Sequence, residues 1–131
     1  MKGDIMNLRI KNVLLGVFLF CIVTTANAGE VSKEVWMDAM STVLPTAFCQ
    51  SKQYFRQCFE VTQIECEETA LSATRICLEK YKEKIPNVLN QPKDGNRWGT
   101  IIGRCAGAAY EIAFQEKRLS SKECNNPANW Q

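Results

Sequence analysis

The sequence predicts a small all-α domain: a disulfide-stapled helical bundle of about four helices, in which the two longest helices form an antiparallel hairpin. Segments 62–85 and 97–119 repeat apolar residues at helical spacing, and a short loop separates them. An even number of cysteines, six, follows residue 28. Such a count favours disulfides in an exported chain, and residues 29–131 have the length of one helical disulfide-bonded domain.

Residues 1–28 have the pattern of a cleaved signal peptide. A small-x-small cleavage site, Ala26-Asn27-Ala28, follows an uncharged run over 13–23, and the basic start consists of Lys2, Arg9 and Lys11. A membrane span needs about 20 apolar residues, more than this run has, which favours cleavage over a membrane anchor. We expect no stable membrane span after cleavage. The mature chain would begin at Gly29 and lie in the periplasm or outside the cell.

The charge balance argues against nucleic acid as a partner. Residues 1–28 hold three basic residues and one acidic residue, Asp4, so their removal takes the net charge from +2 to zero. Nucleic-acid binding needs clustered positive charge, which a neutral mature chain does not suggest.

Translation could start at Met1 or at Met6, which precedes a basic lead without Asp4.

The first mature helix is predicted from about Lys33 to Leu44. Ser32 is a suitable N-cap, and Pro45 is expected to end the helix. The apolar stripe consists of Trp36, Met40, Val43 and Leu44. Thr46 could cap a second, shorter helix that carries Phe48 and Cys49. Residues 53–59 are rich in aromatic side chains and are expected to form a helix end or a packed turn.

Segment 62–85 is predicted to be the longest helix. A capping box opens it, with Thr62 three residues before Glu65, and Pro86 follows its end. One face carries Cys66, Ala70, Ala73, Thr74, Cys77, Tyr81 and Ile85, and it is widened by Ile64, Leu71 and Leu78. After Pro86 we expect one turn at Val88 and Leu89, followed by a loop over 90–96.

The last long helix is predicted from about Arg97 to Leu119. Its main face carries Trp98, Ile101, Ile102, Cys105, Ala109, Ile112 and Leu119. The tail over 120–131 contains Cys124, Pro127 and Trp130, and that tryptophan could pack back on the domain or extend into solvent.

The hairpin register predicts the disulfide pairing. Residues that face each other across two antiparallel helices have numbers with a nearly constant sum, which pairs Cys77 with Cys105 near the loop. The same sum pairs Cys58 with Cys124 and leaves Cys49 with Cys66. Cys49–Cys58 together with Cys66–Cys124 is the main alternative. Zinc is disfavoured, because the sequence has no histidine and no CxxC pair.

The residue types argue against an enzyme. Without histidine the chain lacks the usual general base, and paired cysteines leave no thiolate nucleophile. The acidic cluster of Glu65, Glu67 and Glu68 lies at a predicted helix start, where carboxylates balance the helix dipole. We therefore expect no catalytic residue, no metal site and no cofactor.

Two groups of residues are candidates for binding a partner. Gly99, Gly103 and Gly107 recur every four residues, beside Tyr110 and Phe114, and form a groove. Either the first helix or a partner, including a second copy of this chain, could lie in this groove. The second candidate is an aromatic patch of Tyr54, Phe55, Phe59 and Trp130, although such residues also serve as core or loop anchors.

These features lead to a functional hypothesis. We expect an exported, non-catalytic binding protein of a bacterial envelope, an inhibitor or a toxin-immunity protein, whose partner is another protein. The alternative is a helical carrier of an apolar small ligand. The general plan, an exported helical domain with disulfides, is similar to that of small periplasmic proteins such as helical immunity proteins. No residue carries this likeness, so no site residue follows from it.

Overall fold

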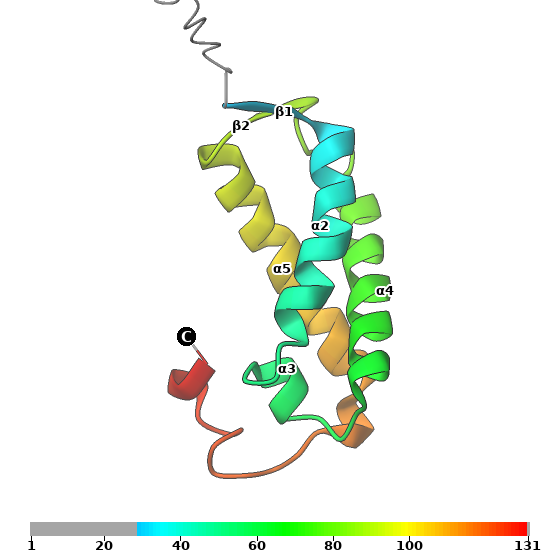
Figure 1. The fold of residues 1–131 in the computed structure, drawn as a ribbon, viewed down its shortest axis with the longest axis vertical. Helices are drawn as coiled ribbons and strands as arrows, with labels where there is room; N and C mark the ends of the chain where they lie inside the picture. The colour runs from blue at the N-terminus through cyan, green and yellow to red at the C-terminus, as the bar shows by residue number, and fades with distance from the viewer. Residues whose placement is uncertain (1–28, 131) are drawn as a thin grey trace, which may run out of the picture.

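A computed structural model describes residues 29–130. The predicted signal peptide, and the choice between Met1 and Met6, lie outside this range. Three long helices form the bundle: α2 (Lys33–Phe48), α4 (Gln63–Tyr81) and α5 (Lys93–Ala113), with the single-turn α3 (Tyr54–Gln57) at one end (Figure 1). The α4 and α5 helices run in opposite directions and α2 packs against α4. The predicted all-α bundle with an antiparallel hairpin is therefore confirmed.

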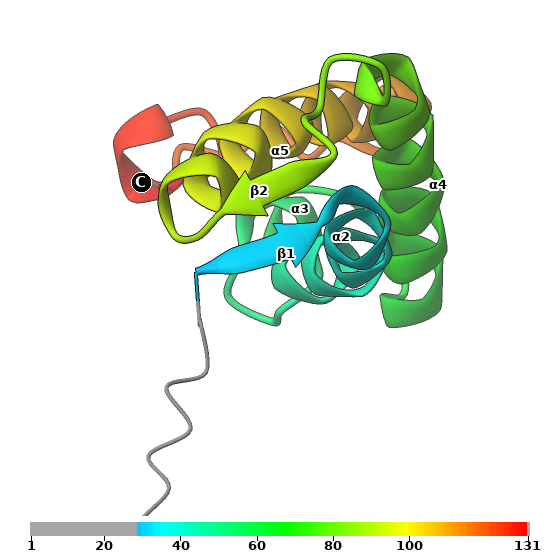
Figure 2. The same ribbon diagram turned by 90° about the horizontal axis from the view of Figure 1, so that it is seen from above.

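A two-stranded sheet closes one end of the bundle. Strand β1 (Glu30–Ser32) pairs antiparallel with β2 (Val88–Asn90), so that Val31 lies opposite Leu89 (Figure 2). The prediction of a helical turn at Val88 and Leu89 was wrong. Strand formation here depends on a partner almost sixty residues away along the chain. Leu89 is fully buried, so the sheet also covers the end of the core.

Helix α2 continues through Pro45 to Phe48, so the expected helix end at Pro45 and the separate cap at Thr46 were wrong. Pro45 lies in the last turn, where its missing N–H removes one hydrogen bond without breaking the helix. Its own carbonyl still accepts a bond from the Cys49 amide at 3.1 Å. Ser32 caps the helix as predicted, whereas Val43, expected in the core, is 56% exposed.

The capping box of α4 is confirmed, because Thr62 and Glu65 exchange side-chain to backbone hydrogen bonds of 3.1 and 2.7 Å. The helix ends at Tyr81, four residues earlier than predicted, and Ile85 is buried in the following turn. Ile64 is exposed. The Lys33 ammonium donates to two carbonyls at this helix end, of Lys82 at 3.2 Å and of Ile85 at 3.3 Å. A cation there also favours the helix dipole.

Helix α5 is displaced towards the N-terminus from its predicted range of 97–119. It begins directly after Pro92, a residue that the first turn of a helix tolerates. Its early start is also held by Asp94, whose carboxylate accepts the Asn90 amide at 2.8 Å. It ends at Ala113 because the following chain pairs with another segment: the Cys58 carbonyl accepts the Leu119 amide at 2.9 Å.

The buried face of α5 is rotated from the predicted one. Its buried residues are Trp98, Ile102, Ala106, Gly107 and Tyr110. Ile112 and Leu119, both predicted on the main face, are 71% and 40% exposed. Gly99 and Gly103 face α2. The buried face of α5 therefore lies between the predicted main face and the glycine stripe.

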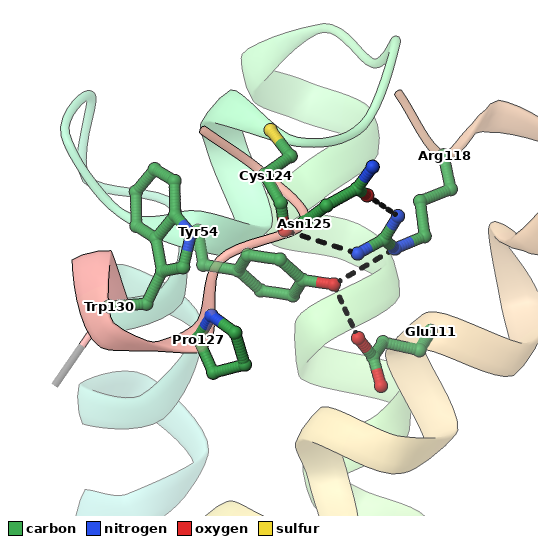
Figure 3. Close-up of a pocket in the computed structure, with 7 residues that line it drawn as sticks. All are labelled: Tyr54, Glu111, Arg118, Cys124, Asn125, Pro127 and Trp130. Atoms are coloured by element: carbon green, nitrogen blue, oxygen red, sulfur yellow. Dashed lines mark hydrogen bonds between the residues drawn. The ribbon is translucent and has the colours of Figure 1, made fainter. Parts of the chain in front are cut away.

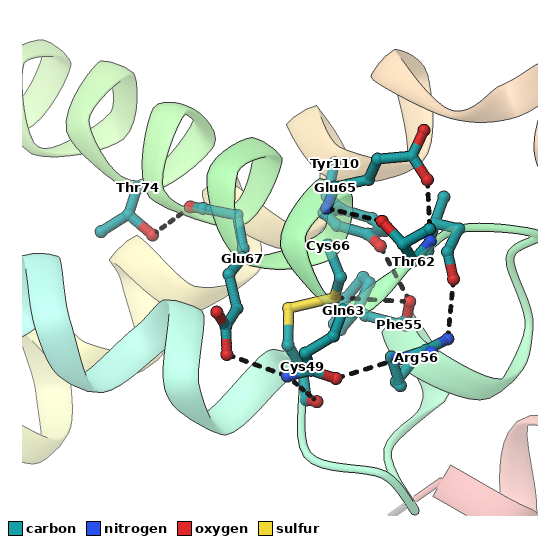
Figure 4. Close-up of a disulfide and its surroundings, with 12 residues drawn as sticks. Cys49, Phe55, Arg56, Thr62, Gln63, Glu65, Cys66, Glu67, Thr74 and Tyr110 are labelled. Carbon is teal, nitrogen blue, oxygen red and sulfur yellow. Dashed lines mark hydrogen bonds between the residues drawn. A yellow bond between two sulfur atoms is a disulfide. The ribbon is translucent and has the colours of Figure 1, made fainter.

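Three disulfides connect the helices, and they join the pairs favoured by the register argument. Cys77–Cys105 links α4 to α5, Cys58–Cys124 holds the tail, and Cys49–Cys66 joins the end of α2 to the start of α4. The Cα–Cα distances are 5.8, 5.6 and 5.9 Å for the pairs starting at residues 49, 58 and 77. Figure 4 shows Cys49–Cys66 beside the capping box of α4.

Candidate functional site

The glycine stripe of α5 is occupied by the chain itself. A Cβ atom added at Gly99 would lie 3.9 Å from the Met40 side chain, and one at Gly103 would lie 3.8 Å from Leu44. Both contacts are with α2. The stripe at Gly99 and Gly103 therefore packs on α2, at a distance that would still accommodate a Cβ atom.

The third glycine faces the aromatic cluster. A Cβ at Gly107 would lie 3.0 Å from the Phe55 ring. That ring is stacked on Phe48, with centroids 4.3 Å apart, and meets the edge of Tyr110 at 5.0 Å. Tyr110 is fully buried, and burial raises the pKa of its hydroxyl to about 12. This hydroxyl donates to the Phe55 carbonyl at 2.9 Å.

The predicted aromatic patch is divided between the core and the surface. Phe59 is 2% exposed and anchors the core, and Phe114 packs against the same cluster. Tyr54 and Trp130 are partly exposed, with ring centroids 5.7 Å apart. The tail therefore packs back on the domain through Trp130, in the short helical segment η2 (Pro127–Trp130).

Tyr54 and Trp130 are two walls of a cavity of about 300 Å³ under the tail, which we call the tail pocket (Figure 3). Its other lining residues are Glu111, Arg118, Cys124, Asn125 and Pro127.

A hydrogen-bond network crosses the tail pocket. The Tyr54 hydroxyl donates to Glu111 at 2.6 Å and accepts from Arg118 Nε at 3.1 Å. Arg118 also donates to the Asn125 side chain and to the Cys124 carbonyl, both at 3.2 Å. Burial is the main cause that raises the pKa of Tyr54, and its bond to Glu111 adds to the shift. The network fixes the tail on α3 and α5.

A second cavity lies on the outer side of the α4–α5 hairpin, and we call it the outer groove. It measures about 570 Å³ and is lined by Ile76, Cys77, Lys80 and Tyr81 of α4 and by Ile101, Arg104, Cys105, Ala108, Ala109 and Ile112 of α5. Ile76 and Ile112 are 62% and 71% exposed, which is unusual for isoleucine near a core. The Cys77–Cys105 disulfide belongs to the lining.

The charges that line the outer groove have one sign. Lys80 and Arg104 are its ionisable cations, and no carboxylate lines it. The Lys80 ammonium lies 5.5 Å from the centroid of the Tyr81 ring. Within residues 29–130, neither Lys80 nor Arg104 forms a salt bridge or a side-chain hydrogen bond. Both cations can therefore meet an incoming anionic group.

Sequence reasoning missed most of these two sites. Glu111 and Arg118 come from different segments and approach Tyr54 only in the folded chain. Ile112 was assigned to the core because its spacing matches that of Trp98 and Cys105. One signal was available: Ile76 lies outside the predicted buried face of its helix.

Among residues 29–130 there is no group of three or more potential metal ligands, and none of the helices there is long and apolar enough to cross a bilayer.

A family model described as "NttA: T2SS substrate NttA" matches residues 30–118. No curated protein and no solved structure matches the chain. The matched residues include the whole outer groove, whereas three residues of the tail pocket, Asn125, Pro127 and Trp130, lie beyond them.

Proposed function

We propose that this chain, which belongs to the NttA family of type II secretion substrates, is a secreted, non-catalytic binding protein that docks on another protein through the outer groove. Membership of this family makes the chain an exported protein. Its three disulfides fit that route, because such bonds form in oxidising compartments such as the periplasm. The proposal adds that the mature domain acts outside the cell.

The observation that carries the proposal is the exposed apolar lining of the outer groove. Ile76 and Ile112 present aliphatic surface to solvent on a small domain, where contiguous apolar patches mark interaction sites. The α5 side of the groove runs from Ile101 to Ile112, about 16 Å at the rise of a helix. This length suits an amphipathic helix of about three turns that lies in the groove.

The charges select among partners. A second copy of this chain docked groove to groove would bring Lys80 and Arg104 close to the same cations, and like charges oppose such a contact. A partner helix with an apolar face and flanking carboxylates would pair with both cations. We therefore assign the groove to an acidic amphipathic helix of another protein.

Secretion also bears on the expected roles. An immunity protein protects the cell that makes it, whereas a secreted protein meets targets outside that cell, so an inhibitor is the better supported of the two. The carrier alternative has less support, because ligand sites bury most of the ligand and the outer groove leaves Ile76 and Ile112 open.

Affinity capture with matched variants tests the proposal. The mature domain, Ile112→Glu and Val35→Glu would be immobilised and exposed to secreted and envelope proteins from the producing cells and to proteins from their surroundings. Val35 is 60% exposed on α2, away from the groove, so its variant controls for the added charge. Both changes are on the surface and should alter stability little.

We expect one partner to be retained by the wild type and by Val35→Glu, and to be lost from Ile112→Glu. Cross-links should join the groove to a helix of the partner that carries carboxylates. A partner that Ile112→Glu retains in full, or cross-links that lie elsewhere on the domain, would contradict the proposal.

A further inference from the structure

The tail pocket has a different chemistry from the outer groove, and we propose that it binds a single neutral saccharide ring. Its walls combine two aromatic rings, Tyr54 and Trp130, with Pro127, and its rim combines one carboxylate, one guanidinium and one amide. A sugar ring has the same dual character, because it presents C–H groups on its faces and hydroxyl groups around its edge. Neither the family description nor the groove proposal assigns this pocket.

The aromatic walls suit the apolar face of a sugar. The Tyr54 and Trp130 rings are inclined at 62°, with centroids 5.7 Å apart, so they form two sides of a corner (Figure 3). Aromatic faces carry negative charge density that attracts positively polarised hydrogen atoms. Trp130 is held in place by its indole N–H, which donates to the Glu123 carbonyl at 3.3 Å.

The polar rim retains unused hydrogen-bonding capacity. Arg118 has five N–H groups, and its three bonds to Tyr54, Asn125 and Cys124 leave two donors. The Glu111 carboxylate accepts only from Tyr54 among residues 29–130, which leaves one of its oxygens free. Free donors and a free acceptor on the same rim can bind a pair of neighbouring hydroxyl groups, since each hydroxyl both donates and accepts.

The charge balance points to a neutral ligand. Glu111 and Arg118 both bond the Tyr54 hydroxyl, so their opposite charges lie on the same rim. A carboxylate ligand would be attracted by Arg118 but repelled by Glu111, and an ammonium ligand the reverse, so for either charge the repulsion offsets the attraction. A neutral polyol uses both groups without that cost.

The size and rigidity of the pocket agree with one sugar unit. Its volume of about 300 Å³ is at the lower end of the range for ligand pockets. The Cys58–Cys124 disulfide and the bonds of Arg118 hold the tail in place before any ligand arrives. Because these groups are already ordered, binding costs little further conformational entropy.

Saturation-transfer and chemical-shift NMR with monosaccharides test this inference on the full mature domain. The probes are the methyl glycosides of glucose, galactose, mannose and N-acetylglucosamine, with glucuronate and glucosamine as charged counterparts. At least one neutral glycoside should bind and shift the Trp130 indole signal, and the two charged sugars should bind about tenfold more weakly.

Variants tie binding to the pocket. Trp130→Ala removes one wall and should weaken binding about tenfold or more, while Trp130→Phe should retain part of it. Glu111→Gln should also weaken binding, whereas Glu116→Gln, an exposed carboxylate nearby and outside the lining, should not. Thermal unfolding of each variant shows whether the domain remains folded. Binding of no neutral glycoside, tighter binding of a charged sugar, or equal binding by folded Trp130→Ala would overturn the proposal.

Discussion

Alanine at Gly103 should stabilise the protein. Glycine inside a helix costs about 0.5–1 kcal/mol relative to alanine, and Gly103 is within α5. The new methyl group would lie 3.8 Å from the Leu44 side chain, an ordinary van der Waals distance, so no repulsion offsets the gain. For a domain of this size, about 1 kcal/mol corresponds to a rise in melting temperature of roughly 4–8 °C.

Gly107 provides the matched comparison one helical turn away. Its added methyl group would lie 3.0 Å from the Phe55 ring, and that ring is packed between Phe48 and Tyr110 and cannot move freely. Overpacking of this kind costs about 1–3 kcal/mol, more than the gain in helix propensity. Gly107→Ala should therefore lower the melting temperature, while Gly99→Ala should behave like Gly103→Ala because its nearest contact is 3.9 Å.

Thermal unfolding followed by circular dichroism, with the disulfides intact, measures all three variants. If Gly103→Ala lowers the melting temperature, or if Gly107→Ala raises it as much as Gly103→Ala does, the packing of α2 and Phe55 against α5 described above is wrong.

Two further predictions concern stability. Replacing Cys58 and Cys124 by serine should lower the free energy of unfolding by about 4 kcal/mol, and replacing Cys49 and Cys66 by about 3 kcal/mol. The first loss is larger because the first pair is 66 residues apart and the second only 17. Denaturant unfolding that reverses this order would contradict the chain-entropy reasoning. The Thr62 backbone N–H, with help from the Lys117 ammonium, lowers the pKa of Glu65 from 4.5 to about 2. Its stabilising effect should therefore be complete above about pH 4.5 and be lost as the pH falls towards 2. Glu65→Gln should reduce the change in unfolding midpoint over this range, and Glu68→Gln, an exposed change on the same helix, serves as the control.

Local sequence signals predicted the parts of the fold that depend on neighbouring residues. The capping box of Thr62 and Glu65 needs only four consecutive residues, and it formed as predicted. The pairing of Cys77 with Cys105 follows from the geometry of an antiparallel hairpin with a short loop. The same sum pairs Cys58 with Cys124, although both lie outside α4 and α5, and Cys49 with Cys66 is the pair that remains.

Features that depend on distant residues could not be predicted in this way. Val88 and Leu89 form a strand only because residues 30–32 pair with them. The rotation of α5 depends on α2, which packs on Gly99 and Gly103 and leaves Ile112 in solvent. The tail pocket needs Tyr54 and Arg118 together, and the Cys58–Cys124 disulfide and the surrounding tail place them there.

The central claim is that the outer groove binds an acidic amphipathic helix, and an NMR titration with two peptides tests it most directly. Both peptides would be amphipathic helices of about four turns with the same leucine face; one carries glutamates beside that face and its twin carries lysines. We expect the acidic peptide to bind about tenfold or more tightly at low ionic strength, and the difference to shrink as salt is added. Chemical shifts should move at Ile76, Ile101 and Ile112 and stay unchanged at Val35, whereas equal binding of both peptides, or shifts that avoid these isoleucines, would contradict the account.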